Sequence, residues 1–262
     1  MHNFEFTAPA TIAEATDALK TDGAQALGGG QTLLPTMKQR LAAPDLLVSL
    51  TGIADMAGVN LSDGSVVIGG ATSHAHVAHE TEAHYPALAA LAGNIGDPAV
   101  RNRGTIGGSV ANNDPAACYP AGALASGAKI TTNTREFSAD DFFKGLFETA
   151  LNEGEIITSI TFPIPTAASY QKFDQPASRF ALVGVFVAKF DTGVRVAVTG
   201  ASNNGVFRWF DAEQALTAEF AKDSIADMAP SAEDMIEDLH GSSDYRAHLV
   251  GVLTRRAVAA CG

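Results

Sequence analysis

Two nearby prolines, Pro163 and Pro165, separate two halves of the chain that differ in their residue pattern. Before them, short apolar segments alternate with glycine-rich turns. After them come longer segments of alternating apolar and polar residues, followed by helical segments. Proline cannot donate a hydrogen bond to a strand ladder, so the strand predicted for residues 155–162 ends here. Because 262 residues is near the length at which one core gives way to two, we expect domains at 1–165 and 166–262.

The first half predicts small helices and strands in an α+β arrangement. Thr11 and Glu14 form a capping box for a helix over residues 11–22, and a strand at 24–27 runs into Gly28. Beyond it the pattern predicts helical segments at 33–41, 86–95 and 115–126, a helix capped by Ser73, strands at 46–50, 66–68, 129–132 and 135–137, an extended segment at 104–111 and a short helix from Ser138.

The second half predicts an antiparallel sheet followed by helices. In the segment 194–201, Val194, Val196 and Val198 alternate with Arg195, Ala197 and Thr199, which is typical of a sheet with one buried face. The other predicted elements are strands at 170–173 and 180–190, a tight turn at 191–193, and helices at 213–218, 232–239 and 245–260. This order favours a small antiparallel sheet that is covered by helices on one face.

Charge and cysteine content exclude several classes of protein. Acidic residues outnumber basic ones by 29 to 17, so nucleic acid and anionic membranes are poor partners. The two cysteines, Cys118 and Cys261, make neither a disulfide framework nor a cysteine-ligated cluster. The first residues do not resemble a signal peptide, and no apolar run is long enough to span a bilayer. We expect a cytoplasmic protein.

Two glycine-rich segments, residues 27–35 and 103–109, are the strongest chemical signal in the chain. Residues without a Cβ let backbone N–H groups converge on one anion, and Thr32, Thr105 and Ser109 add hydroxyl donors. Two such loops facing each other would fit a pyrophosphate. Leu33 replaces the third glycine of a Rossmann fingerprint, and no phosphate-binding P-loop occurs. Either segment taken alone is better explained as an ordinary turn.

Other polar residues have simpler interpretations. His74, His76, His79 and His84 lie within eleven residues, but a solvated helix face explains them better than a metal site. Arg101 and Arg103 fit a phosphate contact, a contact with acids of a partner, or a solvated loop. Cys118 is expected to be a buried helix residue rather than a reactive thiol. No Ser–His–Asp arrangement or nucleophile elbow is found, so no catalytic residue is predicted.

Several motifs, taken in order, resemble those of one known family. They are 27–35 (LGGGQTLLP), 100–109 (VRNRGTIGGS), 113–117 (NDPAA), 153–157 (EGEII) with Pro163, 244–249 (DYRAHL) and 255–257 (RRA). Together they are similar to the FAD-binding medium subunit of the molybdenum hydroxylases, the group containing carbon monoxide dehydrogenase and xanthine dehydrogenase. The resemblance covers essentially the whole chain, and the TIGG core is its most specific part.

The resemblance implies a fold and a set of cofactor contacts. Residues 1–165 would form a two-lobed FAD-binding domain of the vanillyl-alcohol oxidase type, with lobes of about 1–55 and 56–165. Residues 166–262 would form a small C-terminal domain with a three-stranded antiparallel sheet and helices. The implied FAD contacts are Leu27, Gly28, Gly29, Gly30, Gln31, Thr32, Leu33, Ile95, Gly104, Thr105, Ile106, Gly107, Gly108, Ser109, Asn112, Asp114, Cys118, Ile157 and Lys172.

The resemblance also implies a role in electron transfer. FAD would be held noncovalently, and electrons would arrive from a [2Fe-2S] cluster on a small subunit. Substrate would be hydroxylated at a molybdopterin centre on a large subunit, and the flavin would pass electrons to quinone, NAD or oxygen. Ile95 would lie against the flavin ring, Lys172 near its edge, and residue 118 at the adenosine end.

Two positions depart from the family pattern. Gln31-Thr32 replaces a His-Ser pair common in carbon monoxide dehydrogenases, and Cys118 replaces an acidic residue that contacts the cofactor. A thiol cannot supply the two acceptors of a carboxylate. The alternatives to a subunit of a hetero-oligomer are a stand-alone FAD oxidase and a scaffold that has lost FAD.

Overall fold

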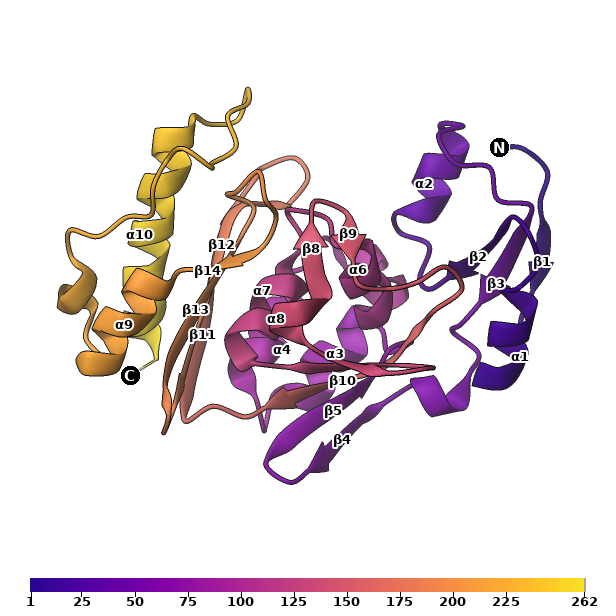
Figure 1. Cartoon of the computed structure of the whole chain (residues 1–262), viewed down its shortest axis with the longest axis horizontal. Helices are drawn as coiled ribbons and strands as arrows, with labels where there is room; N and C mark the ends of the chain where they lie inside the picture. Colours follow the sequence, from indigo (N-terminus) through magenta and orange to yellow (C-terminus); the bar gives the residue numbers. More distant parts are fainter. Residues whose placement is uncertain (262) are drawn as a thin grey trace.

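A computed structural model describes residues 1–261 and places the strands in three main sheets (Figure 1). The N-terminal sheet is parallel, with the order β1–β3–β2. The side chain of Thr11 accepts a hydrogen bond from the Glu14 N–H at 3.1 Å, as the capping box predicts. The elements of this lobe are β1 (Glu5–Thr7), α1 (Ile12–Ala18), β2 (Ala24–Leu27), α2 (Leu33–Lys38), β3 (Leu46–Ser49) and the 3₁₀ helix η1 (Ala54–Met56).

The central sheet is antiparallel, with the order β4–β5–β10–β6–β7. Its strands are β4 (Val59–Ser62), β5 (Ser65–Gly69), β6 (Lys129–Thr132), β7 (Glu136–Ser138) and β10 (Ile157–Pro163). The other elements of this region are α3 (His74–Thr81), α4 (Pro86–Gly93), α5 (Pro98–Arg103), α6 (Ile106–Asn112), α7 (Cys118–Ser126), α8 (Ala139–Phe142) and a hairpin of β8 (Phe143–Gly145) and β9 (Glu148–Thr149). Of these, α3, α6, α7 and α8 contact strands of the sheet.

Helix α6 corrects the expectation that residues 104–111 are extended. Thr105 caps the helix by accepting the Gly108 N–H at 3.2 Å. A Cβ on Gly107 would lie 2.5 Å from the carbonyl oxygen of Gly70, and the Gly107 N–H donates to that oxygen at 2.9 Å. Gly107 is thus explained by close packing of a short helix on the segment after β5.

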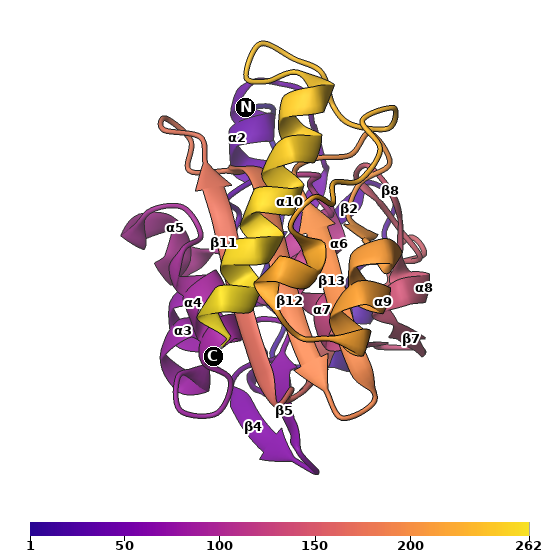
Figure 2. The same cartoon turned by 90° about the vertical axis from the view of Figure 1, so that its left-hand side faces the viewer.

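The C-terminal sheet has the order β11–β12–β13–β14, one strand more than the resemblance implies. Its strands are β11 (Ala167–Asp174), β12 (Ala181–Phe190), β13 (Gly193–Thr199) and β14 (Phe207–Arg208). Figure 2 shows α9 (Phe210–Ala218) and α10 (Ser243–Ala260) across one face, while α4 and α7 cover the other. The prediction that helices cover only one face is therefore wrong.

Strand β12 explains the double coverage, because both of its faces are apolar. Val185 and Val187 join the core under α9 and α10, whereas Phe186 and Ala188 join the central core. Even the polar residues of β13 face protein: Arg195 Nε donates to the Leu124 carbonyl at 2.9 Å. Residues 194–201 do alternate between apolar and more polar side chains, but the more polar side of the strand faces α7 rather than solvent.

Residues 232–239 are not helical, contrary to prediction. Met235 instead makes an isolated bridge with Ser202, and the Ile236 N–H donates to the Ala201 carbonyl at 2.8 Å. Burial of Met235 accounts for the apolar spacing that suggested a helix. A short 3₁₀ helix, η2 (Lys222–Ile225), precedes this segment. None of the helices within residues 1–261 combines the length and apolar composition that a membrane span requires.

Candidate functional site

The two glycine-rich segments meet, which confirms the expectation that they face each other. Gly29 follows β2, and Arg103 and Gly104 lie at the junction of α5 and α6. A Cβ on Gly29 would lie 1.8 Å from the Arg103 carbonyl oxygen and 2.5 Å from the Gly104 Cα. Because both neighbours are backbone atoms, only a residue without a side chain allows this approach.

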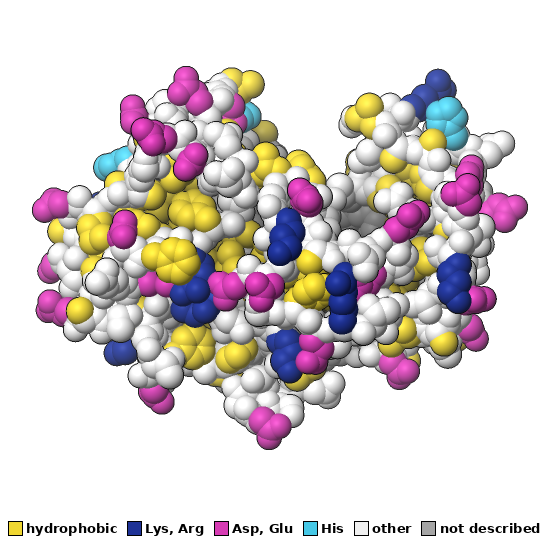
Figure 3. Space-filling model, viewed as in Figure 1, with side chains coloured by type: hydrophobic (Ala, Val, Ile, Leu, Met, Phe, Trp, Pro, Cys, Tyr) yellow, Lys and Arg dark blue, Asp and Glu magenta, His cyan; other side chains and the backbone are white. Residues whose placement is uncertain are grey.

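A cavity of about 670 Å³ lies along this contact, which is within the usual range for a small-molecule site. Figure 3 shows the surface hollowed between the N-terminal lobe and the rest of the molecule. The predicted contact residues that line the cavity are Leu27, Gly28, Gly29, Gly30, Gln31, Thr32, Leu33, Ile95, Gly104, Thr105, Gly107, Gly108, Ser109, Asn112, Asp114, Cys118, Ile157 and Lys172. Ile106 is the exception, because its side chain is buried in the central core.

The two loops differ in the backbone donors that they offer. Within residues 1–261, no acceptor pairs with the N–H groups of residues 29–32. Most backbone N–H groups of the second segment are already paired: Ile106 donates to the Thr72 carbonyl at 3.0 Å, and the N–H groups of Gly107 and Gly108 also have acceptors. An anion would therefore find most of its free amide donors on the first loop, and the expectation that both loops hold a pyrophosphate stays a prediction.

Lys172 and Cys118 lie together at one end of the cavity. The Lys172 side chain is 1% exposed and forms an ion pair with Asp174 at 2.9 Å. Its Nζ donates to the carbonyl oxygens of Asn94 at 2.7 Å and Arg179 at 2.9 Å. Cys118 Sγ lies 3.9 Å from this Nζ, and burial raises the pKa of the thiol.

This proximity corrects one pair of expectations. Residue 118 was expected at the adenosine end of FAD and Lys172 near the flavin edge, but atoms 3.9 Å apart cannot contact opposite ends of an extended dinucleotide. Cys118 and Lys172 therefore line the same part of the cavity, so the two expected contacts cannot both hold. The burial of Cys118 agrees with the prediction of a buried helix residue.

Asn113 fixes the position of Phe147 at the rim of the cavity, a lining residue that the sequence analysis missed. Its side-chain Nδ2 donates to the carbonyl oxygens of Gly145 at 2.8 Å and Glu148 at 2.9 Å, and the backbone carbonyl of Asn113 accepts the Phe147 N–H. These bonds hold Phe147, which has a φ of 56°, where it lines the cavity. Beside it, burial raises the pKa of Asp114, whose carboxylate accepts the Ala116 N–H at 2.8 Å.

His74 corrects the interpretation of the histidine cluster as a solvated face. His76, His79 and His84 are exposed, but His74 is 4% exposed and lines the cavity. Burial, helped by the nearby Arg101, lowers the pKa of His74 from 6.5 to about 4, so the ring is neutral near pH 7. Within residues 1–261, no group of three or more side chains could hold a metal ion.

Arg101 and Arg103 belong to α5 rather than to a loop. Arg101 Nη1 donates to the carbonyl oxygens of Ile95 at 3.1 Å and Gly96 at 2.8 Å. It thereby fixes the turn that carries Ile95 into the cavity wall. A solvated loop, one of the three interpretations of these arginines, is thus excluded for Arg101.

The lowered pKa of His74 predicts a loss of stability at mildly acidic pH. As the pH falls below 6.5, the unfolded chain takes up a proton on this ring and the native chain does not, so unfolding is favoured. We expect the wild type to lose about 2 kcal/mol relative to His74→Gln between pH 7 and pH 5. Urea unfolding at both pH values measures this; parallel profiles for the two proteins would show that His74 titrates normally.

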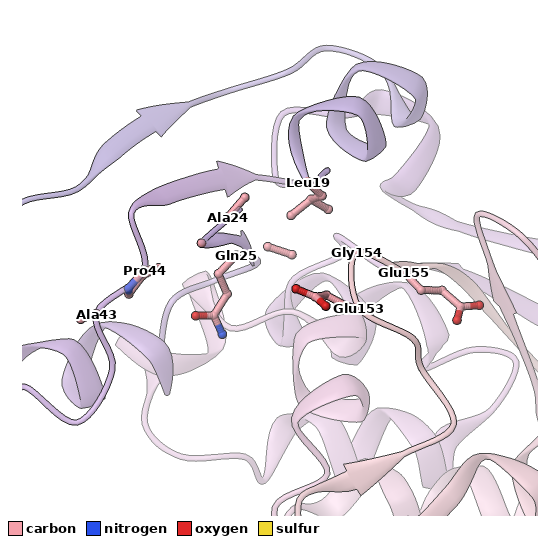
Figure 4. A pocket seen from close by; sticks show the side chains of 10 residues that line it. Leu19, Ala24, Gln25, Ala43, Pro44, Glu153, Gly154 and Glu155 are labelled. Carbon is pink, nitrogen blue, oxygen red and sulfur yellow. The ribbon is translucent and has the colours of Figure 1, made fainter. Parts of the chain in front are cut away.

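A second hollow, of about 480 Å³, adjoins the first (Figure 4). Gln25, Ala26 and Glu155 line both hollows. Arg135 donates to both carboxylate oxygens of Glu155, at 3.0 and 2.8 Å, and holds the pKa of Glu155 down at about 2. This ion pair fixes the segment that leads into Ile157, at the boundary of the N-terminal lobe.

Comparison with known proteins gives a consistent result. A family model described as the FAD binding domain in molybdopterin dehydrogenase matches residues 2–165. The carbon monoxide dehydrogenase medium chain of Hydrogenophaga pseudoflava is 33% identical, over 97% of this chain and 96% of that one. The nicotine 6-hydroxylase medium subunit of Paenarthrobacter nicotinovorans is also 33% identical, over 98% of this chain and 96% of that one.

A solved structure supports the same relationship. The carbon monoxide dehydrogenase from Hydrogenophaga pseudoflava that lacks the Mo-pyranopterin moiety aligns with a TM-score of 0.89 and 32% identity. The alignment covers 99% of this chain and 97% of that one. These findings agree with the resemblance inferred from the glycine-rich motifs.

Proposed function

Because the chain belongs to the family of FAD-binding domains in molybdopterin dehydrogenases, we propose that it binds one FAD in the cavity between its two glycine-rich loops and transfers electrons within a larger complex. The observation that carries the proposal is the contact between the loops, with the N–H groups of residues 29–32 left without acceptors beside the cavity. Neither loop contains an acidic residue that would repel a pyrophosphate.

The residues of the cavity fit the parts of this cofactor. The amides of residues 29–32 would hold the pyrophosphate, since hydrogen bonds to a charged group contribute about 1.5–3 kcal/mol each. Ile95 would pack on the flavin ring, and Lys172 would place its buried positive charge near the ring edge. FAD, when bound, supplies the capacity to accept and release electrons. The protein would orient FAD and exclude water from it.

We further propose the partners of this chain from its relatives. Those relatives are named as medium chains or subunits of dehydrogenases and hydroxylases. In the proposed complex, a small [2Fe-2S] subunit delivers electrons to the FAD, and a large molybdopterin subunit carries out substrate hydroxylation. Domains at 1–165 and 166–262 and a cytoplasmic location are parts of the same proposal.

Anaerobic mixing tests the proposed electron transfer. The FAD-loaded chain is mixed with its reduced [2Fe-2S] subunit, which is isolated separately from the native source, and the flavin absorbance is followed. Bleaching of the flavin bands supports the proposal. A chain that purifies alone and oxidises a substrate by itself would instead be a stand-alone oxidase, and a folded chain that takes up no FAD would be a scaffold.

Cys118→Asp is expected to tighten FAD binding. The carboxylate would lie on the cavity wall within reach of Lys172 and would offer two acceptors to a cofactor hydroxyl, where the thiol offers almost none. We expect the dissociation constant to fall at least about tenfold, as for one added charge-assisted hydrogen bond of about 1.5 kcal/mol or more. Fluorescence titration measures it, with Cys118→Asn as the neutral control. Equal affinities for all three proteins would mean that residue 118 does not touch FAD.

A further inference from the structure

The side chain of His74 lines the cavity, and within residues 1–261 its Nδ1 has no hydrogen-bond partner. Its Nδ1 is fully buried and unpartnered, in a ring that is only 4% exposed. Unpaired polar atoms in protein interiors are uncommon and call for an explanation. For a residue in the wall of a ligand site the explanation is simple, because the ligand is the missing hydrogen-bond partner.

The buried surroundings select which nitrogen carries the proton. The ring is neutral, so one nitrogen donates and the other accepts. Leaving a donor N–H unpaired in the interior is rarer than leaving an acceptor unpaired. With no acceptor for Nδ1, the favoured form has the proton on Nε2. His74 therefore offers an uncharged N–H donor to an oxygen in the cavity.

The position of the His74 ring indicates which oxygen of the ligand would accept this hydrogen bond. On one side Nε2 lies against Gly104, where an added Cβ would approach it to 2.5 Å, and Gly104 is the residue that contacts Gly29. On the other side the ring packs on Tyr119, with centroids 5.3 Å apart, next in sequence to Cys118. His74 thus lies between the loop proposed for the pyrophosphate and the Cys118–Lys172 end proposed for the flavin ring.

The part of FAD that joins the pyrophosphate to the flavin ring is the ribityl chain, which carries hydroxyl groups. We propose that His74 Nε2 donates a hydrogen bond to a ribityl hydroxyl and so positions the chain that leads to the flavin. This inference rests on the proposed FAD binding. It assigns His74 as a positioning residue for the cofactor, a role that the sequence did not suggest.

The test compares ligands that contain and lack the ribityl chain. FAD and ADP are titrated into wild type, His74→Leu and His74→Gln by calorimetry at pH 7.5. Leu has a similar volume but no donor, whereas the Gln side-chain amide can place an N–H near the Nε2 position. We expect FAD to bind about tenfold more weakly to His74→Leu and within about threefold of wild type to His74→Gln. ADP should bind all three proteins equally.

Tyr119→Phe is the matched control. It removes a neighbouring buried hydroxyl that also lacks a partner, but Tyr119 does not line the cavity. We expect FAD and ADP to bind this variant as they bind wild type. Thermal unfolding verifies that all variants are folded at the titration temperature.

The outcomes separate this inference from the proposed function. If wild type binds no FAD, the proposed function fails. If wild type binds FAD but His74→Leu binds it equally well, only the role of His74 is overturned. Equal weakening of ADP and FAD by His74→Leu would also overturn it, because the contact would then be to the phosphates.

Discussion

Gly29→Ala is expected to weaken FAD binding at least a hundredfold, which corresponds to about 2.7 kcal/mol. The added methyl would lie 1.8 Å from the Arg103 carbonyl oxygen, so the two loops would have to separate. Separation moves the free amides of residues 29–32 away from the opposite wall of the cavity. The N-terminal lobe keeps its own core around Val48 and Met56, so we expect the variant to fold. FAD titration with circular dichroism measures both properties.

Gly52→Ala is the matched control for this substitution. Gly52 lies in the same lobe, and its added methyl would meet no atom closer than 3.9 Å. Both residues have ordinary backbone conformations, so the comparison isolates the effect of space. We expect Gly52→Ala to bind FAD as wild type does. Wild-type affinity in Gly29→Ala would show that close contact of the loops is not needed for binding.

Lys172→Met is expected to have the second largest effect, on both stability and FAD binding. Methionine keeps the apolar stem but leaves the carbonyl oxygens of Asn94 and Arg179 without their donor. Because Asp174 is 44% exposed and can be solvated, we expect destabilisation of about 2 kcal/mol, below the cost of breaking a fully buried ion pair. The loop after β11, which lines the cavity at Arg179, should loosen and weaken FAD binding.

Lys189→Met provides the comparison for Lys172→Met. Lys189 lies on the adjacent strand β12, and its ammonium group lies 4.8 Å from the Phe220 ring centroid at an exposed position. Loss of this contact should cost about 0.5–1 kcal/mol and leave FAD binding unchanged. Urea unfolding and FAD titration measure both variants. Equal stability of Lys172→Met and wild type would mean that the buried ammonium does not tie the end of α4 to the loop between β11 and β12.

The sequence predicted structure best at positions where the residue type itself limits the local conformation or packing. The crowded glycines predicted a close approach of two loops, and Gly29 against Gly104 is that approach. The Thr11 and Ser73 caps predicted two helix starts correctly, because a cap depends on contacts within one turn.

It was least informative where a distant partner decides the outcome. Helix α6 depends on Gly70, and the absence of a helix at 232–239 depends on Ser202, and neither partner is near in sequence. His74 looks like its exposed neighbours His76 and His79 until the packing of α3 against Gly104 and Tyr119 is known. The proximity of Cys118 to Lys172 likewise required coordinates.

Titration of FAD into the cofactor-free chain tests the central claim most directly, followed by both visible absorbance and calorimetry. The contact between the loops and the unpaired amides of residues 29–32 predict saturation at one FAD per chain, with ADP competing for the same site. A correctly folded chain that binds no FAD, or that binds FAD without competition from ADP, would contradict the account.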